Sequence, residues 1–215
     1  MLDHRTVSLS EKVFERLEND ILSGKYPRGT ILTEMMLVSD LGVSRTPIRE
    51  ALRRLEQEHI IQTTGKGIVV LGVTDKDLAD IFNIRIRIEG MVSAETALRI
   101  TEEELAELRE TLELQEFYVQ KGDADHIKQM DSKFHQLIYR FSGSCVYNDS
   151  LIPLHKRVQK YRKASVENSS RAEQSAREHR AIFEAIEQRD PAAAEKHTVD
   201  HILNARDYIL NRGIN

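Results

Sequence analysis

The chain has 215 residues, of which 31% are charged and 40% are hydrophobic, and its net charge is −4; this is the make-up of a globular protein with one or two cores. No apolar run approaches the roughly 20 residues that span a bilayer, and the first residues lack the apolar segment of a secretory signal. Cys145 is the only cysteine, which excludes an internal disulfide and fits a reducing compartment. We therefore expect a cytoplasmic protein with no membrane partner.

Residues 1–73 predict a domain of short elements. Ser8 starts a helix that Gly24 ends, and a second helix runs from about residue 34 to 41, where Gly42 follows it. A third helix begins after Ser44, a good N-cap residue. The β-branched stretch 61–64 and the apolar stretch 68–71 then predict two strands joined around Gly65-Lys66-Gly67.

Residues 74–215 predict only helices. Helix starts, glycine breaks and the Asp190-Pro191 pair divide this part into six helices at about 75–100, 102–121, 123–141, 145–166, 170–189 and 191–212, with Ser170 as the expected start of the fifth. Long helices with short connections are typical of an antiparallel bundle. The fold class is therefore mostly α: an N-terminal winged helix-turn-helix domain (1–73) and a six-helix bundle (74–215).

The second and third helices have the proportions of a helix-turn-helix. Apolar residues of the third helix share one face and predict its packing side: Ile48, Ala51, Leu52 and Leu55. Thr46, Arg49 and Arg53 lie on the opposite side, and Arg45 lies in the first turn, where a recognition helix meets base edges. Arginine can donate two hydrogen bonds to guanine, while Ser44, Thr46 and the N-terminal N–H groups suit phosphate oxygens.

Charge alone does not favour nucleic acid. Residues 1–72 hold ten lysines and arginines against ten aspartates and glutamates, so DNA reading would depend on a few well-placed cations, including Lys66 between its two glycines. The pattern leaves open an ordinary solvated helix face, with Glu50 and Glu56 as partners of the arginines. It also leaves open a module that binds another protein.

A second group of polar residues lies in the bundle. Asp131 and His135 are four residues apart and share a helix face, and His179 and His201 lie inside the last two helices. Apolar residues flank all four at core-like spacing, so they are expected to point inward. One carboxylate and three imidazoles would suit a first-row transition metal, although each histidine could instead be an ordinary core residue. His197 could replace His201, whereas His126 and His155 lie in polar settings and are expected to face solvent.

The run from Leu41 to Leu55, with Gly42-Val43-Ser44-Arg45-Thr46-Pro47 at its start, resembles the recognition segment of GntR-family regulators. Tyr26-Pro27-Arg28-Gly29 is similar to the family's turn, and Gly65-Lys66-Gly67 to its wing tip. The resemblance implies a homodimer whose recognition helices and wings contact double-stranded operator DNA with two-fold symmetry. The resemblance implicates Arg45, Arg49 and the wing glycines, Gly65 and Gly67. With the residues argued from their positions, the predicted DNA-binding set is Ser44, Arg45, Thr46, Arg49, Arg53, Gly65, Lys66 and Gly67.

The bundle resembles the FCD effector domain of that family, in its shorter, VanR-like form. The matching segments are 85–89, 131–135 and 178–182, together with His201. The resemblance selects Asp131, His135, His179 and His201 as ligands of a divalent ion. Zinc is the first choice, with nickel, manganese and iron as alternatives.

The resemblance also implies a small organic carboxylate as effector. Arg85 matches a position that often supplies a pocket arginine, although it could instead pair with Glu89, four residues on. Arg157 and Tyr161, one turn apart, are further effector-binding candidates. The expected function is a transcriptional regulator, such as a repressor, whose operator affinity depends on the carboxylate. The alternative is a metal-dependent hydrolase or lyase that uses the Asp/His₃ site.

Overall fold

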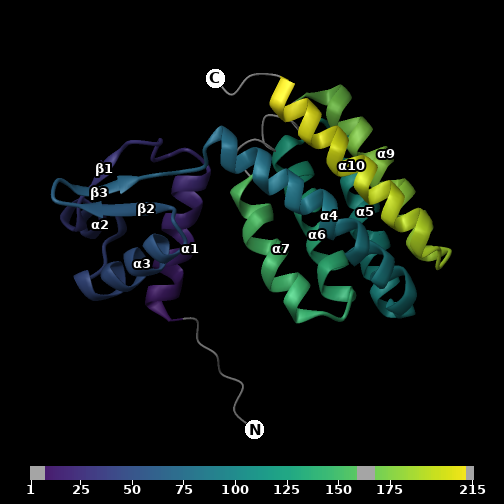
Figure 1. The fold of residues 1–215 in the computed structure, drawn as a ribbon, viewed down its shortest axis with the longest axis horizontal. Coiled ribbons are helices and arrows are strands. Elements are labelled where there is room, and N and C mark those ends of the chain that lie inside the picture. Colours follow the sequence, from purple (N-terminus) through teal and green to yellow (C-terminus); the bar gives the residue numbers. More distant parts are fainter. Residues whose placement is uncertain (1–7, 159–167, 212–215) are drawn as a thin grey trace, which may run out of the picture. The chain divides into compact units, whose positions relative to one another are not determined.

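The computed structural model describes residues 8–158 and 168–211, and these residues form two compact units that divide after Thr74 (Figure 1). The first unit contains α1 (Leu9–Leu22), β1 (Ile31–Leu32), α2 (Glu34–Leu41), α3 (Arg45–Gln57), β2 (Ile61–Thr64) and β3 (Gly67–Val70). The second contains α4 (Asp75–Arg99), α5 (Glu102–Lys121), α6 (Ala124–Phe141), α7 (Cys145–Arg157), α9 (Ser169–Glu187) and α10 (Pro191–Asn211).

The first unit is a winged helix-turn-helix. The side chain of Ser8 accepts the Glu11 amide at the start of α1, and Gly42 ends α2 in the left-handed conformation. The predicted apolar face of α3 is buried against α1 and α2. The β2–β3 hairpin has the expected position, but β1 was not predicted. It pairs antiparallel with β3, so the strand order is β1-β3-β2.

The pairing of β1 with β3 requires a glycine at position 67. Its φ is +128°, and a Cβ there would lie 2.9 Å from the Leu32 carbonyl oxygen. Both the backbone conformation and the close approach of β1 therefore exclude a larger residue. At Gly65, by contrast, a Cβ would meet nothing within 4 Å, so the tip of the wing is open.

The second unit is a helical bundle. The capping box of Thr101 and Glu104 starts α5, and Asp190 accepts the Ala193 amide ahead of Pro191 at the start of α10. Helix α9 begins earlier than predicted, because Asn168 rather than Ser170 caps it by accepting the Arg171 amide. Helix α7 ends at Arg157, and the rest of the helix predicted over 145–166 lies outside the described residues.

Helix α4 packs most extensively against α10 (Figure 1). Gly90 makes this contact possible, since a Cβ at that position would lie 2.9 Å from Cγ2 of Val199 and 3.1 Å from Cγ of Glu195. The core of the bundle includes the apolar residues that flank the predicted ligands, all of them buried: Phe134, Ile138, Ile182, Ile186 and Ile202. Within the described ranges, every helix is too short or too polar to cross a bilayer.

Candidate functional sites: a recognition helix and a buried histidine cluster

The outer face of α3 carries the predicted reading residues. Ser44, Arg45, Thr46, Arg49 and Arg53 are all exposed. Ser44 occupies the N-cap position, yet its side chain makes no capping hydrogen bond. Its hydroxyl and the first N–H groups of α3 therefore remain available to an anion such as a DNA phosphate.

Two arginines of α3 have carboxylate partners on other helices. Nε of Arg49 lies 2.9 Å and 3.0 Å from the two carboxylate oxygens of Glu34, at the start of α2, and this pair holds the pKa of Glu34 below its ordinary value. Arg54 pairs with Glu11 and lies over the ring of Phe14, so it ties α3 to α1. Glu56, one of the two partners in the alternative that the sequence left open, accepts the Thr63 amide, while Arg49 and Arg54 pair with carboxylates of α2 and α1.

The wing tip is the other exposed element of this unit. The Lys66 amide donates to Oγ1 of Thr64, and that hydroxyl donates to the Gly67 carbonyl. These bonds fix the turn while the side chain of Lys66 stays exposed.

In the bundle, three helices bring the predicted metal ligands together. Asp131 and His135 lie on α6, His179 on α9 and His201 on α10, and all four are buried. One nitrogen from each histidine lies within 4.8 Å of the other two. Oδ1 of Asp131 lies 3.7 Å from Nε2 of His179.

The outer nitrogens of the histidines are held by polar side chains. Nδ1 of His179 donates to Oε1 of Gln115 at 2.7 Å, and Nδ1 of His201 donates to Oε2 of Glu178 at 2.7 Å. Nδ1 of His135 faces Oε2 of Glu89 at 3.5 Å. Each imidazole therefore has an oxygen atom at Nδ1, and this contact sets its tautomer and leaves Nε2 with a lone pair.

The Nε2 atoms of the buried histidines form an arrangement that suits a cation. Nε2 of His179 and Nε2 of His201 are 3.3 Å apart, and Nε2 of His135 is buried without a hydrogen bond. With the protons on the Nδ1 atoms, the Nε2 lone pairs of His179 and His201 face one another. Burial lowers the pKa of His135 and lowers that of His201 to about 4, although Glu89 and Glu178 oppose this; both rings are therefore neutral at pH 7. The donor set fits a divalent metal ion, which neutral imidazoles and a carboxylate bind.

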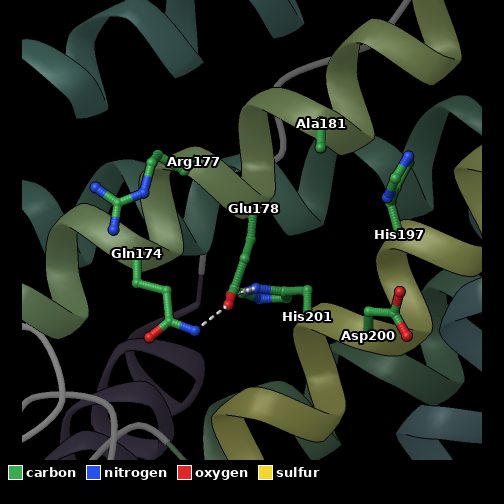
Figure 2. A pocket seen from close by; sticks show the side chains of 7 residues that line it. All are labelled: Gln174, Arg177, Glu178, Ala181, His197, Asp200 and His201. Atoms are coloured by element: carbon green, nitrogen blue, oxygen red, sulfur yellow. Dashed lines mark hydrogen bonds and ion pairs between the residues drawn. The ribbon is translucent and has the colours of Figure 1, made fainter.

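Glu178 connects the cluster to the surface. It accepts from His201 on α10 and from Arg171 on its own helix, and Asn204 donates to its other oxygen. Burial raises the pKa of Glu178, but these donors outweigh it and hold the pKa below the ordinary value. Glu178 reaches from α9 to His201 (Figure 2), and both residues line a cavity of about 280 Å³ together with His197 and Asp200. His197 therefore belongs to this outer cavity.

Sequence reasoning placed His155 wrongly and missed Gln115. His155 is buried, its ring centroid is 5.2 Å from that of His135, and its Nδ1 lies 3.4 Å from the Tyr139 hydroxyl. Burial and the neighbouring His135 lower the pKa of His155 well below its usual range. Leu151 is also buried, and its position one turn before His155 was a signal for the inward face. His126 is exposed beside Asp123, as expected.

The structure does not bring the predicted effector-binding residues together as it does the predicted metal ligands. Arg85 is buried and forms an ion pair with Glu89, whose pKa is held well below its ordinary value by Arg85 and His135 against the effect of burial. This pair is the alternative that the sequence left open. Glu89 lies between the Arg85 guanidinium and His135, so the guanidinium is next to the histidine cluster but not part of it. Arg157 is the last residue of α7 and is half-buried. Tyr161 lies outside the described residues.

A winged helix-turn-helix with an exposed arginine helix, joined in one chain to a bundle with a buried polar cluster, defines a class: DNA-binding regulators with a separate sensory domain. Residues 9–70 match the model of the bacterial regulatory proteins of the gntR family, and residues 80–204 match the FCD domain. The chain belongs to the GntR family and is a transcriptional regulator rather than an enzyme.

Several relatives are similar over most of the chain. A Bacillus subtilis protein described as the uncharacterized HTH-type transcriptional regulator YdhC is 32% identical over 87% of this chain and 85% of its own. The Escherichia coli transcriptional repressor RspR is 28% identical over 92% and 87%. The gluconate operon repressor of B. subtilis is 37% identical over 62% of this chain and 55% of its own. The structure of E. coli McbR/YncC has the same fold, with a TM-score of 0.83, 24% identity and coverage of 96% and 99%.

Proposed function

We propose that this regulator acts in the cytoplasm as a homodimer on operator DNA with two-fold symmetry, and that a small organic carboxylate bound beside a metal ion in the bundle controls its operator affinity. The convergence of one ring nitrogen from each of three buried histidines, whose Nδ1 atoms each face an oxygen atom, is the observation that carries the sensory half of the proposal. Relatives described as repressors favour repression as the direction of control.

The DNA-binding half rests on the exposed face of α3. Arg45 and Arg49 are placed to donate to guanine edges, and each such contact contributes about 1–3 kcal/mol of discrimination. Ser44, Thr46 and Arg53 would contact phosphates, and Lys66 with the open Gly65 would reach the backbone from the wing. Arg49 has to leave Glu34, but solvent screens this surface ion pair, so breaking it costs less free energy than a contact with a base contributes.

The metal would be held by Asp131, His135, His179 and His201. When bound, it would supply positive charge for the four ligands and for an anionic group of the effector. Zinc suits this donor set, and nickel, manganese and iron are alternatives. Gln115, Glu178 and Glu89 would orient the imidazoles, since metal-bound histidines donate their other N–H group to such oxygens.

The effector would be a carboxylate because a guanidinium lies next to the cluster. Arg85 has Glu89 as its partner in this structure, so an incoming carboxylate has to share or displace that contact. Arg157 is a second candidate cation, and Tyr161 remains a prediction. A preference of metal and carboxylate for one arrangement of the dimer would change the spacing of the recognition helices and thereby the fit to two half-sites.

DNA reading is tested with Arg49→Ala. Operator preference over a scrambled duplex should fall about 5- to 150-fold, the equivalent of one lost base contact. Glu34→Ala is the matched control, because it removes the same ion pair but keeps the arginine. Unchanged preference in Arg49→Ala, or an equal loss in both variants, would remove Arg49 as a reading residue.

The metal site is tested by the metal content of protein purified without chelator. His135→Ala and His179→Ala should each lose the bound ion, whereas His197→Ala, which changes the outer cavity, should keep it. Full occupancy in both cluster variants would refute the site. An organic acid that shifts operator affinity only in the metal-loaded protein would support the effector half.

A further inference from the structure

The four predicted metal ligands are closed off from solvent. Each is at most 4% exposed: Asp131, His135, His179 and His201. An ion that binds among them therefore has to pass between side chains. His201 is the ligand that also lines the outer cavity between α9 and α10 (Figure 2), so its imidazole lies between this cavity and the rest of the histidine cluster.

Two further residues of α10 line the outer cavity with atoms that can bind a metal. Asp200 is exposed and His197 is half-buried, and within residues 8–158 and 168–211 neither side chain has a hydrogen bond or an ion pair. They are three residues apart, so one side of α10 carries both. Carboxylate oxygens and imidazole nitrogens are ligands of divalent transition metals, and Asp200 directly precedes His201 in the chain.

The charges that line the cavity favour a cation. Glu178 and Asp200 contribute two carboxylates, and Arg177 contributes one guanidinium. The Arg177 side chain is 70% exposed, and its Nη1 lies 3.8 Å from Oε2 of Glu173. Solvent and this carboxylate therefore weaken the one positive charge of the lining, and the lining as a whole attracts a cation.

The opposite side of His135 is less favourable to a cation. There Nδ1 of His135 faces Glu89, and Glu89 is paired with the buried guanidinium of Arg85. The pair has no net negative charge to attract an ion, and a buried guanidinium is screened little by water. A divalent cation approaching from this side would have to pass a positive charge, whereas the cavity presents carboxylates.

We propose that the outer cavity is the route by which the metal ion enters and leaves the cluster. Asp200 and His197 bind the hydrated divalent cation first, and His201 then transfers it to the other ligands. Nδ1 of His201 is held by Oε2 of Glu178 at 2.7 Å, so transfer requires this hydrogen bond to open. The inference rests on the metal site of the proposed function and adds how that site is filled and emptied.

A residue on an entry route has a distinct kinetic signature. The dissociation constant of the ion is the ratio of its release rate to its loading rate, and the ion leaves by the route through which it enters. A change in the route therefore slows both rates by the same factor and leaves the affinity unchanged. Loss of a ligand, or of a residue that orients one, lowers the affinity itself.

The carboxylate of the cavity is tested with Asp200→Asn. Stopped-flow mixing of the metal-free protein with Zn²⁺ should show loading about 10-fold slower than in the unchanged chain, and release to a chelator should slow by the same factor. Asp207→Asn is the matched control, since Asp207 is an exposed carboxylate of α10 that does not line the cavity; its rates should not change. A lower affinity with an unchanged loading rate in Asp200→Asn would overturn the route.

The space in the cavity is tested separately with Ala181→Leu. Ala181 lines the cavity, so a larger side chain there narrows the route without changing its charge. Loading and release should both slow about 5-fold, because closely packed side chains leave little room for an ion. Ala192→Leu, at an exposed position of α10 outside the cavity, is the control, and circular dichroism confirms that both variants are folded. Equal rates in the two variants would refute passage through the cavity.

The outcomes separate the route from the proposed function. If the unchanged chain binds no Zn²⁺ in equilibrium dialysis, the metal site fails and the route fails with it. If it binds Zn²⁺, but Asp200→Asn and Ala181→Leu load and release the ion at unchanged rates, the outer cavity is not the route and the metal-dependent regulator stands.

Discussion

His201 links the acid stability of the metal-free protein to the burial of one imidazole. Burial lowers the pKa of His201 to about 4 although Glu178 acts in the opposite direction, whereas an unfolded chain titrates its histidines at about 6.5. The unfolded state therefore takes up its proton at higher pH than the folded state. The stability that neutral His201 allows is present above a pH of about 6.5 and is lost as the pH falls towards about 4.

The size of the effect follows from the two pKa values. Proton uptake by the unfolded state lowers the free energy of unfolding by about 2 kcal/mol at a pH of about 5 and by about 3 kcal/mol at a pH of about 4. His201 is 3% exposed, so solvent does not screen the effect. The pKa values of His135 and His155 are lowered by burial too, and both residues add to the loss.

The assay is urea unfolding of chelator-treated protein across this pH range, with His201→Gln as the comparison. Carboxylates away from His201 titrate alike in both proteins, so the difference between their curves reports the imidazole together with its partner Glu178. The unchanged chain should lose about 2 kcal/mol more than the variant between a pH of about 7 and about 5. Parallel curves would show that the buried imidazole does not control acid stability.

Three further substitutions probe separate parts of the chain. Lys66→Ala should weaken binding to operator and scrambled DNA alike and lower the slope of log K against log salt by about 1; a loss confined to operator would contradict a backbone contact. Gln115→Leu should lower zinc affinity about 10- to 100-fold in a chelator competition, because His179 loses the oxygen that orients it, and an unchanged affinity would remove that role. Gly67→Val should cost about 1–3 kcal/mol of stability through backbone strain and contact with β1, whereas Gly65→Ala should leave the melting temperature unchanged; equal effects would show that β1 does not constrain the wing.

The sequence predicted the helices well because their starts and ends are local. Ser8, Gly42 and the Asp190-Pro191 pair each act through hydrogen bonds or dihedral angles within a few residues. Strand β1 was missed because it is two residues long and is defined only by its pairing with β3. Such a strand has no local pattern to recognise.

The site shows the same division between local and long-range information. Asp131 and His135 were predicted from their helical spacing, since one face of α6 carries both. Gln115 is 64 residues from His179, and a lone glutamine in an amphipathic helix gives no sign that it will meet an imidazole. The burial of His155 also depends on packing between helices. Its polar neighbours in the sequence led to the wrong prediction that it faces solvent.

The ion pair between Arg49 and Glu34 bears on how the regulator searches a genome. A carboxylate that already occupies the arginine competes with every phosphate the helix passes, and the neutral charge of residues 1–72 adds no compensating attraction. We therefore expect random DNA to bind the protein weakly, and an operator with a guanine opposite Arg49 to displace Glu34. Because millions of competing sites sequester a regulator in proportion to its non-specific affinity, we expect Glu34 to leave more of the protein free to reach the operator.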